Sequence, residues 1–309
     1  MSAPRVLITG GTGLLGKHLS ESAPRGWEVG VTWHVNLPPE EWRSGFHPLD
    51  VRNASAVERL ISGFKPDIVI HTASIGSVEE AERSPERAAL VNVEGTAHVA
   101  RACARSGAFL IHISSNAVFD GKNPPYSEEA PLKAVNRYGE IKIESERRVR
   151  ESGAAALIIR PILMYGWPFP DGRENAVTRW LAELERGGRV QAAEDIVSMP
   201  LSASNCAQAV WAAAERRTTG AVHIAGADRV SLFHFAQEAA RVFGFDPTRV
   251  IPVPSSHWTE LAPRPRDTSF ITARMQQVLG VRPVGISEGL THMAGCIGPL
   301  NRHRAPRTA

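Results

Sequence analysis

A tyrosine and a lysine that could exchange a proton stand four residues apart in the segment NRYGEIKIE, at Tyr138 and Lys142. The segment has a helical pattern, and side chains four apart on a helix are neighbours. An ammonium beside a phenol favours the phenolate, so the pair could serve as an acid/base. Exposed surface pairs share this spacing. Gly139, however, costs such a helix on the order of 1 kcal/mol relative to Ala, which indicates a packing or functional reason for it.

A second chemical signal lies near the N-terminus, in the segment RVLITGGTGLLGKHL. Its Gly10, Gly13 and Gly16 directly follow a buried-strand pattern and open a helical one. In a dinucleotide-binding turn the first glycine permits the tight turn, the second lets the backbone approach a pyrophosphate, and the third lets the helix pack closely. The alternative is a structural turn without a ligand.

The end of the next strand pattern bears on which dinucleotide binds. NAD-binding folds usually place an acid there to bind the adenosine ribose. This chain reads VGVTWHVN, with His34 at about that position and no carboxylate until Glu40. A ribose 2′-phosphate would not be repelled, and His34 or Arg43 could bind it. We therefore expect NADP(H) to be favoured, and NAD(H) stays open because His34 could simply end the strand.

The elements that must position these residues alternate through the first half of the chain. Short runs rich in Val and Ile, typical of strands buried on both faces, alternate with amphipathic helical runs. We predict strands at 5–10, 27–33, 66–73, 108–115 and 155–166, and helices from about Leu14, over 54–64, over 85–106 and around Tyr138. This order predicts right-handed crossovers and a parallel sheet, hence a Rossmann-type doubly wound α/β fold.

The pattern changes after residue 160. Helical runs at 176–188, 202–217 and 231–244, a strand at 220–226 and Pro-rich loops follow. We predict an NAD(P)-binding Rossmann domain over 1–160, a smaller C-terminal substrate-binding lobe over 161–300 that is packed on or intertwined with it, and a disordered tail over 301–309. The loops 165–175 and 254–268 are expected to close over a substrate, with Arg173, Arg264 and Arg266 meeting a diphosphate.

Composition narrows the function classes. The chain has 309 residues, 43% of them hydrophobic, and a net charge of +3 with both signs interspersed, so nothing indicates nucleic-acid binding. The three cysteines lack C-x-x-C spacing and the 11 histidines lack ligand spacing, which argues against a metal site. A strand pattern starts close to Met1 and no apolar run approaches membrane length. We expect a cytoplasmic protein with neither signal peptide nor membrane partner.

Several segments together resemble a known family. TGGTGLLG, VNVEGT, SSNAVFDG, YGEIK and RPILMYG are similar to the motifs of extended short-chain dehydrogenase/reductases. Within that group, HTASIGSVEEAE, VFDGKNPPYSEEAPLKAVNRYGEIK and RPRDTSF most resemble dTDP-4-dehydrorhamnose reductases. The resemblance implies an NAD(P)H-dependent reductase of a 4-keto sugar nucleotide.

The resemblance also implies roles for individual residues. Ser115, Tyr138 and Lys142 would form the catalytic triad, in which Ser115 binds the substrate oxygen and Tyr138 supplies the proton. Cofactor contacts would come from the glycine turn, Tyr138 and Lys142, and also from Leu14, Leu15, Asp50, Val51, Ala73, Ser74, Asn92, Arg160 and Ile162. Substrate contacts would come from Val78, Asn116, Leu163, Arg173 and Arg266.

Three of these cofactor residues have structural alternatives. Asp50 could be a helix N-cap, Asn92 could bind backbone, and Arg160 could be a paired structural charge.

The chain departs from the reductase pattern at several positions. Asn116 and Ala117 replace an Asp-Tyr pair, Leu163 replaces a tryptophan of the sugar site, and His18 replaces a metal-binding glutamate of some members. The missing acid pair argues against a 4,6-dehydratase. An epimerase stays open, and so does a non-catalytic NADP-binding regulatory subunit like the β subunit of methionine adenosyltransferase. The sugar, its nucleotide and the oligomeric state, a homodimer included, also stay open.

Overall fold

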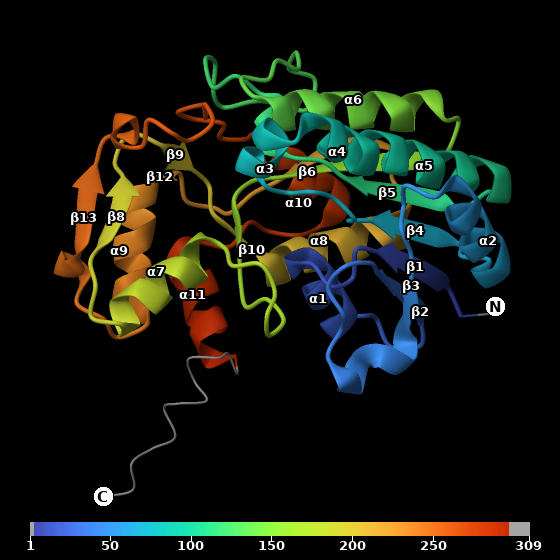
Figure 1. Ribbon diagram of the computed structural model, residues 1–309, viewed down its shortest axis with the longest axis horizontal. Coiled ribbons are helices and arrows are strands. Elements are labelled where there is room, and N and C mark those ends of the chain that lie inside the picture. The colour runs from blue at the N-terminus through green and yellow to red at the C-terminus, as the bar shows by residue number, and fades with distance from the viewer. Residues whose placement is uncertain (1–2, 297–309) are drawn as a thin grey trace, which may run out of the picture.

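A parallel sheet of seven strands forms the centre of the protein (Figure 1), whose computed structural model describes residues 3–296. The strands are β1 (Arg5–Thr9), β2 (Glu28–Trp33), β3 (Phe46–Pro48), β4 (Ile68–His71), β5 (Phe109–Ile113), β6 (Ala156–Pro161) and β11 (Gly220–Ile224). Their order is β11-β6-β5-β4-β1-β2-β3, so the order reverses between β1 and β4. Ligands of doubly wound folds bind at this switch point, outside the carboxyl ends of the strands.

Helices cover both faces of the sheet, as the Val- and Ile-rich strands require. They are α1 (Leu14–Glu21), α2 (Ala54–Phe64), α3 (Val78–Arg83), α4 (Pro85–Ala89), α5 (Gly95–Ser106), α6 (Arg137–Glu151), α8 (Ala203–Arg216) and α10 (Ala273–Leu279), with a π-helical turn at Leu90–Glu94. α2, α5 and α6 lie side by side on one face, while α1, α8 and α10 cover the other (Figure 1). The predicted Rossmann-type fold is confirmed.

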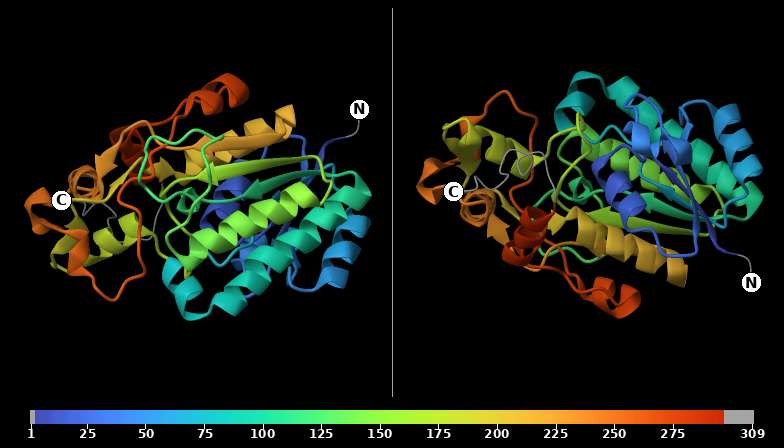
Figure 2. Two further views of the ribbon diagram at one scale, coloured as in Figure 1. Left: turned by 90° about the horizontal axis from the view of Figure 1, so that it is seen from above. Right: turned by 90° about the horizontal axis from the view of Figure 1, so that it is seen from below.

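A smaller lobe lies at one end of the sheet, as both views of Figure 2 show. It contains α7 (Ala176–Glu185), β8 (Val190–Ala193), β9 (Val197–Ser198), β12 (Val230–Ser231), α9 (Leu232–Val242), β13 (Val250–Val253) and α11 (Ile286–Gly295), and the short pair β7 (Met164–Tyr165) and β10 (Leu201–Ser202) borders it. Tyr165, Trp167 and Phe235 belong to its own hydrophobic core. β1 starts at the opposite end of the molecule, so the carboxyl ends of the parallel strands face this lobe (Figure 1).

The chain crosses between the sheet and the lobe more than once. β11 pairs in parallel with β6, and α8 packs against α1, although both follow the boundary placed after residue 160. Residues from the second half of the chain therefore complete the Rossmann sheet. No helix among residues 3–296 is long and apolar enough to cross a membrane. The tail 301–309 lies outside the described residues.

Candidate active site

The glycine turn brings the ends of three strands together. Gly10 has a φ of +74°, and a Cβ there would lie 2.6 Å from the backbone of Ala73, which follows β4. Gly11 N donates to the carbonyl of Thr32 in β2 at 2.8 Å. A Cβ at Gly16 would lie 2.5 Å from the carbonyl oxygen of Gly10, so α1 packs directly on the turn. A side chain at either glycine would break the turn.

The N-terminus of α1 points to a ligand at this turn. The N-cap of α1 is Gly13, which is exposed. Because glycine has no side chain, the N-cap residue leaves the first N–H groups of the helix free to bind a ligand. Leu15 lies in the core and Leu14 is half-buried, so these residues can offer a ligand chiefly their backbone N–H groups. The first N–H groups of a helix lack intrahelical partners and favour anions. The turn therefore fits the pyrophosphate of a dinucleotide.

Charged side chains gather where the adenosine end of such a dinucleotide would lie. His34 Nε2 is 3.5 Å from Asp50 Oδ2. This contact joins the end of β2, which His34 follows, to the end of β3, which Asp50 follows. Arg52 binds both oxygens of Asp50, and these hydrogen bonds hold the pKa of that carboxyl below its usual range. Arg43 is exposed, with its Nε 3.4 Å from the carbonyl oxygen of Pro38. Arg52 directly follows Asp50 and Val51 in the sequence, but it was not identified from the sequence as a residue of this site.

The structure rules out one alternative for Asp50 and limits how Val51 could contact a cofactor. The N-cap of α2 is Asn53, whose side chain accepts from Ala56 N at 3.0 Å, so Asp50 does not cap the helix. The Val51 side chain is buried, and a Cβ on Gly95 would lie 2.6 Å from it. Only the backbone of Val51 could therefore contact a cofactor.

The loop after β4 is held in place by Asn92. The Asn92 amide accepts from Ile75 N at 2.8 Å and donates to Ile75 O at 3.0 Å. Asn92 is buried in the π-helical turn, a distortion frequent at functional sites. Ala73 touches the glycine turn and Ser74 is exposed beside it. Asn92 thus braces the backbone that carries Ala73 and Ser74.

The triad forms because α6 starts against the turn that follows β5. Ser115 lies two residues after β5 and caps the short 3-10 turn Asn116–Val118, and its hydroxyl is close enough to Tyr138 on α6 to oppose the rise in the pKa of that phenol. A Cβ at Gly139 would lie 2.2 Å from the carbonyl oxygen of Ala117, so only glycine permits this approach. The side chain of Asn136 caps α6 by accepting from Gly139 N at 2.9 Å. The unexpected glycine beside the tyrosine is therefore what brings Tyr138 to Ser115.

Burial dominates the electrostatics of the pair. Tyr138 is half-buried, and burial raises the pKa of its phenol, while the Ser115 hydrogen bond and the charge of Arg173 oppose that rise. Lys142 Nζ lies 5.9 Å from the tyrosine ring and donates to Ile113 O at 3.0 Å. Burial lowers the pKa of Lys142 to about 8, against the pull of Glu146. In the protein without ligand, burial therefore outweighs any lowering of the Tyr138 pKa by the Lys142 charge.

A buried ion pair lies beneath the triad. Arg160 donates from Nε and Nη2 to the two oxygens of Glu146, each at 2.8 Å, and from Nη1 to Glu128 O at 3.1 Å. Ser114 Oγ donates to Glu146 Oε1 at 2.6 Å. Arg160 is thus the paired structural charge of the alternative interpretation, and Ile162 packs in the core. Glu146 was missed, although its position four residues after Lys142 places it on the same helix face.

The segment 263–270, distant in the sequence, packs against the residues next to the triad. Asn116 Nδ2 donates to Thr268 Oγ1 at 2.6 Å, and Asn136 Nδ2 donates to Pro263 O at 2.8 Å. Tyr126 also pairs with Phe270 through an isolated bridge. Residues 263–270 therefore lie against both the turn after Ser115 and the start of α6.

Some of the predicted substrate residues lie near the triad, and others lie at the smaller lobe. Arg173 comes close to the triad, since its charge acts on Tyr138 and a Cβ at Gly76 would lie 3.3 Å from its Nη1. Val78 opens α3 nearby and is half-buried. Leu163, however, packs on the core of the smaller lobe. Arg266 has a side chain 77% exposed and 3.8 Å from Asp195 of that lobe.

Arg264, which was expected to meet a diphosphate together with Arg173 and Arg266, does lie against the sheet domain. Its Nη2 donates to Glu79 Oε1 at 2.6 Å, which joins the loop 254–268 to α3. The charge of Arg173, on the other predicted clamp loop, also helps to lower the pKa of Glu79.

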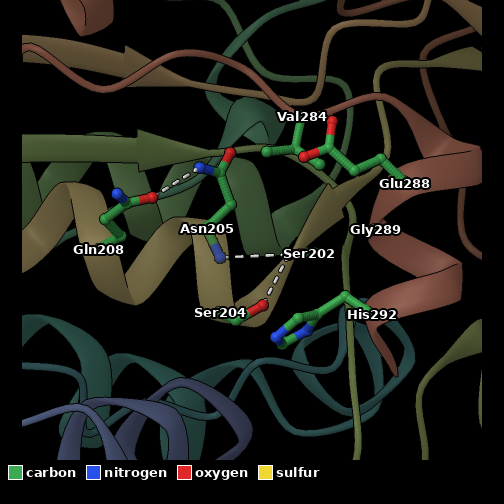
Figure 3. Close-up of a pocket in the computed structure, with 8 residues that line it drawn as sticks. All are labelled: Ser202, Ser204, Asn205, Gln208, Val284, Glu288, Gly289 and His292. Carbon is green, nitrogen blue, oxygen red and sulfur yellow. Dashed lines mark hydrogen bonds between the residues drawn. The ribbon is translucent and has the colours of Figure 1, made fainter. Parts of the chain in front are cut away.

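A separate cavity of about 290 Å³ lies between the start of α8 and α11 (Figure 3). Ser202 accepts there from Asn205 N at 3.1 Å, while His292 and Glu288 reach in from α11. None of the triad residues lines this cavity. It belongs to the border of the smaller lobe, and we assign it no part in catalysis.

The protein combines a parallel sheet, a dinucleotide turn at its switch point, and a Ser–Tyr–Lys arrangement beside that turn. This combination is typical of the extended short-chain dehydrogenase/reductases. Residues 4–296 match the family described as the RmlD substrate binding domain. The chain belongs to this family.

Its relatives include enzymes and a subunit of a different enzyme. The chain is 32% identical over 288 residues to dTDP-4-dehydrorhamnose reductase of Mycobacterium tuberculosis, covering 91% of this chain and 88% of that protein. It is 30% identical over 297 residues to methionine adenosyltransferase 2 subunit beta of Bos taurus, covering 93% and 87%. Among solved structures, dTDP-4-dehydrorhamnose reductase of Bacillus anthracis in complex with NADP superposes with a TM-score of 0.82 at 25% identity, covering 94% of this chain and 98% of that one.

Proposed function

We propose that this protein is an NADPH-dependent reductase of a 4-keto sugar nucleotide. The observation that carries the proposal is the contact of Ser115 with Tyr138, with Lys142 one turn further along α6. The sequence likeness to the Mycobacterium tuberculosis reductase and the likeness in fold to the Bacillus anthracis reductase with NADP support it.

Each residue has a distinct task in this reaction. The glycine turn and the N-terminus of α1 hold the pyrophosphate of the dinucleotide, whose nicotinamide supplies the hydride when bound. Ser115 Oγ orients the substrate carbonyl by donating to its oxygen. Tyr138 donates its phenolic proton to the same oxygen as negative charge develops there. Lys142 holds a positive charge beside the phenol, which stabilises the phenolate that remains.

Turnover with defined substrates tests the proposal. NADPH oxidation should be followed with a panel of 4-keto sugar nucleotides that includes dTDP-4-dehydrorhamnose. A reductase consumes one NADPH per carbonyl, whereas an epimerase interconverts sugar nucleotides without net consumption. Failure of every 4-keto sugar nucleotide to oxidise NADPH would overturn the proposal.

A second candidate is a cofactor-binding regulatory subunit. The observation that favours it is the 30% identity to methionine adenosyltransferase 2 subunit beta over 93% of the chain. In that case the protein would retain a methionine adenosyltransferase in a pull-down and show no turnover on any carbonyl. The intact triad favours the enzyme.

We expect NADPH to bind more tightly than NADH. The pair His34 and Arg43 is exposed near the end of β2, and Arg52 neutralises the neighbouring Asp50. Arg43 can bind a 2′-phosphate by charge-assisted hydrogen bonds, and His34 can donate a ring N–H to it. Titration against intrinsic tryptophan fluorescence measures both affinities.

The double change His34→Ala and Arg43→Ala should narrow this preference. Arg59→Ala, on the exposed surface of α2, is the control and should leave both affinities unchanged. Tighter binding of NADH by the wild type would contradict the prediction.

Lys142 should impose an alkaline limit on catalysis. Its pKa is lowered to about 8, so the ammonium is present below that pH and is lost as pH rises through it. We expect kcat/KM to fall above about pH 8 in a pH–rate profile, because kcat/KM reports the groups of the free enzyme. Lys142→Ala should weaken NADPH binding as well as turnover. A profile that stays flat well above pH 8 would rule out this role.

A further inference from the structure

The loop 165–175 is closed by hydrogen bonds at both its base and its tip. At the base, Asn175 Nδ2 donates to Gly166 O at 2.7 Å. At the tip, Gly172 N donates to Phe169 O at 2.9 Å. The two central residues of this tip are a proline and an aspartate with a φ of +61°, as in a type II turn. The loop is therefore compact, and a contact made by one of its side chains helps to place the residues beside it.

Phe169 fastens this loop to the cofactor side of the sheet domain. Its side chain is buried, 7% exposed, and its ring lies 5.4 Å from that of Trp42 in an edge-to-face arrangement. Lys17 Nζ, from α1, lies 5.7 Å from the centre of the Phe169 ring, within the range of a cation–π contact. Trp42 belongs to the 3-10 turn Glu40–Gly45, which also carries Arg43. The loop 165–175 thus rests on two elements that border the proposed cofactor site.

The contact continues from Trp42 to the glycine turn. The ring of Trp42 lies 6.4 Å from that of Phe46, again edge to face. A Cβ at Gly11 would lie 3.2 Å from the ring of Phe46, so Phe46 packs against the glycine turn itself. A line of contacts therefore runs from Gly11 through Phe46 and Trp42 to Phe169. Contiguous packed side chains of this kind can carry energetic coupling between two sites.

The other end of this line lies at the triad. Arg173 follows the turn that Phe169 opens, and its Nη1 lies beside Gly76, since a Cβ on that glycine would be 3.3 Å away. The charge of Arg173 also opposes the rise that burial causes in the pKa of Tyr138. A displacement of Phe169 would therefore carry a cation away from the catalytic phenol.

We propose that Trp42 and Phe169 are positioning residues, through which the bound dinucleotide holds the loop 165–175 beside the triad. The inference rests on the proposed function, because it makes NADPH the ligand that prepares the substrate side of the site. Arg43, proposed to bind the 2′-phosphate, adjoins Trp42, and the glycine turn lies against Phe46. A ligand that orders a segment lowers the entropy that a second ligand loses there, so NADPH and the nucleotide sugar should strengthen each other's binding.

Hydrogen–deuterium exchange with mass spectrometry tests this coupling with the cofactor alone. Saturating NADPH should slow exchange in peptides covering 168–175 by about 5-fold or more in the wild type, the lower end of ordinary coupling between sites. Phe169→Leu and Trp42→Leu keep an apolar side chain but remove the contact between the rings. In both variants NADPH should slow this exchange by less than about 2-fold. Calorimetry should show that both variants still bind NADPH.

Trp258→Leu is the matched control. Trp258 is half-buried in the other loop, 254–268, and its ring lies 5.3 Å from that of His257, so its loss should leave the effect of NADPH on 168–175 as in the wild type. If NADPH does not slow exchange at 168–175 in the wild type, or slows it equally in Phe169→Leu, the coupling is overturned while the proposed function stands.

Titration of UDP and dTDP by calorimetry extends the test to the substrate side. Saturating NADPH should lower the Kd of the wild type for these nucleotides by about 5-fold or more, and this gain should be lost in Phe169→Leu. A Kd that does not change with NADPH would overturn the coupling and leave the proposed function standing. If neither nucleotide binds even with NADPH present, the nucleotide-sugar proposal is overturned, while slowed exchange at 168–175 would still establish that the cofactor holds the loop.

Discussion

Tyr138→Phe is expected to lower turnover by a factor on the order of 100 or more while leaving NADPH affinity near that of the wild type. The change removes one hydroxyl and keeps the ring that packs at the start of α6. That hydroxyl lies close to Ser115, whose side chain opposes the rise in its pKa, and it is the proton donor that the proposed reaction requires. Steady-state kinetics with a 4-keto sugar nucleotide and fluorescence titration with NADPH measure the two effects separately.

Tyr165→Phe is the matched control for this prediction. Tyr165 is buried in the core of the smaller lobe, with its ring 5.1 Å from that of Phe235, so its hydroxyl takes no part in the reaction. We expect this variant to keep turnover within a few-fold of the wild type. If Tyr138 and Lys142 were an ordinary helix pair, Tyr138→Phe would be equally mild, since such pairs contribute only tenths of a kcal/mol. Wild-type turnover in Tyr138→Phe would end the catalytic assignment.

Local sequence patterns were sufficient for most of the sheet. β1, β2, β4, β5 and β6 were predicted because strands buried on both faces need unbroken runs of Val, Ile and Leu. β11 was also recognised as a strand but was assigned to the wrong part of the molecule. A strand pattern does not say which sheet the strand joins, and here the partner β6 ends almost sixty residues earlier. β3, β8 and β13 have only three or four residues each, too few to establish a period.

The parts of the site whose residues lie within one short sequence motif were predictable. The glycine turn and the Tyr138–Lys142 pair are of this kind, and the structure adds the reason for Gly139, its contact with Ala117. The choice between Arg264 and Arg266 was not predictable. The two flank Pro265 in an irregular segment without periodicity, so only its course across the molecule decides which of them meets Glu79.

Glu146 should matter most to stability, because it is the buried anion that joins α6 to β5 and β6. Its carboxylate receives hydrogen bonds from Ser114, Arg150 and Arg160, and it is completely inaccessible to solvent. Burial alone would raise the pKa of Glu146, but Arg160 and the other donors hold it below the ordinary value of 4.5. The folded protein therefore keeps this group ionised without solvent.

Glu146→Gln is expected to lower the free energy of unfolding by about 3–5 kcal/mol, since it leaves the Arg160 guanidinium buried without its counter-charge. Urea denaturation measures the change. Glu144→Gln on the same helix is the matched control, because Glu144 pairs with Arg147 and Arg148 near the surface. It should cost less than about 1 kcal/mol. Equal losses in the two variants would contradict the assignment of a buried, structurally essential pair.

The dependence of this loss on pH separates the charge of Glu146 from its packing. A carboxyl whose pKa is depressed in the folded state stabilises the protein above its unfolded pKa, and that stabilisation is lost as pH falls through the folded value. The amide introduced by Glu146→Gln does not titrate, so the stability gap between the wild type and this variant should narrow from about pH 7 to about pH 3. The Glu146 charge also raises the pKa of Lys142. In Glu146→Gln the alkaline limb of kcat/KM should therefore move to lower pH, a shift that loss of packing alone would not produce, and an unmoved limb would show that Glu146 acts on stability only.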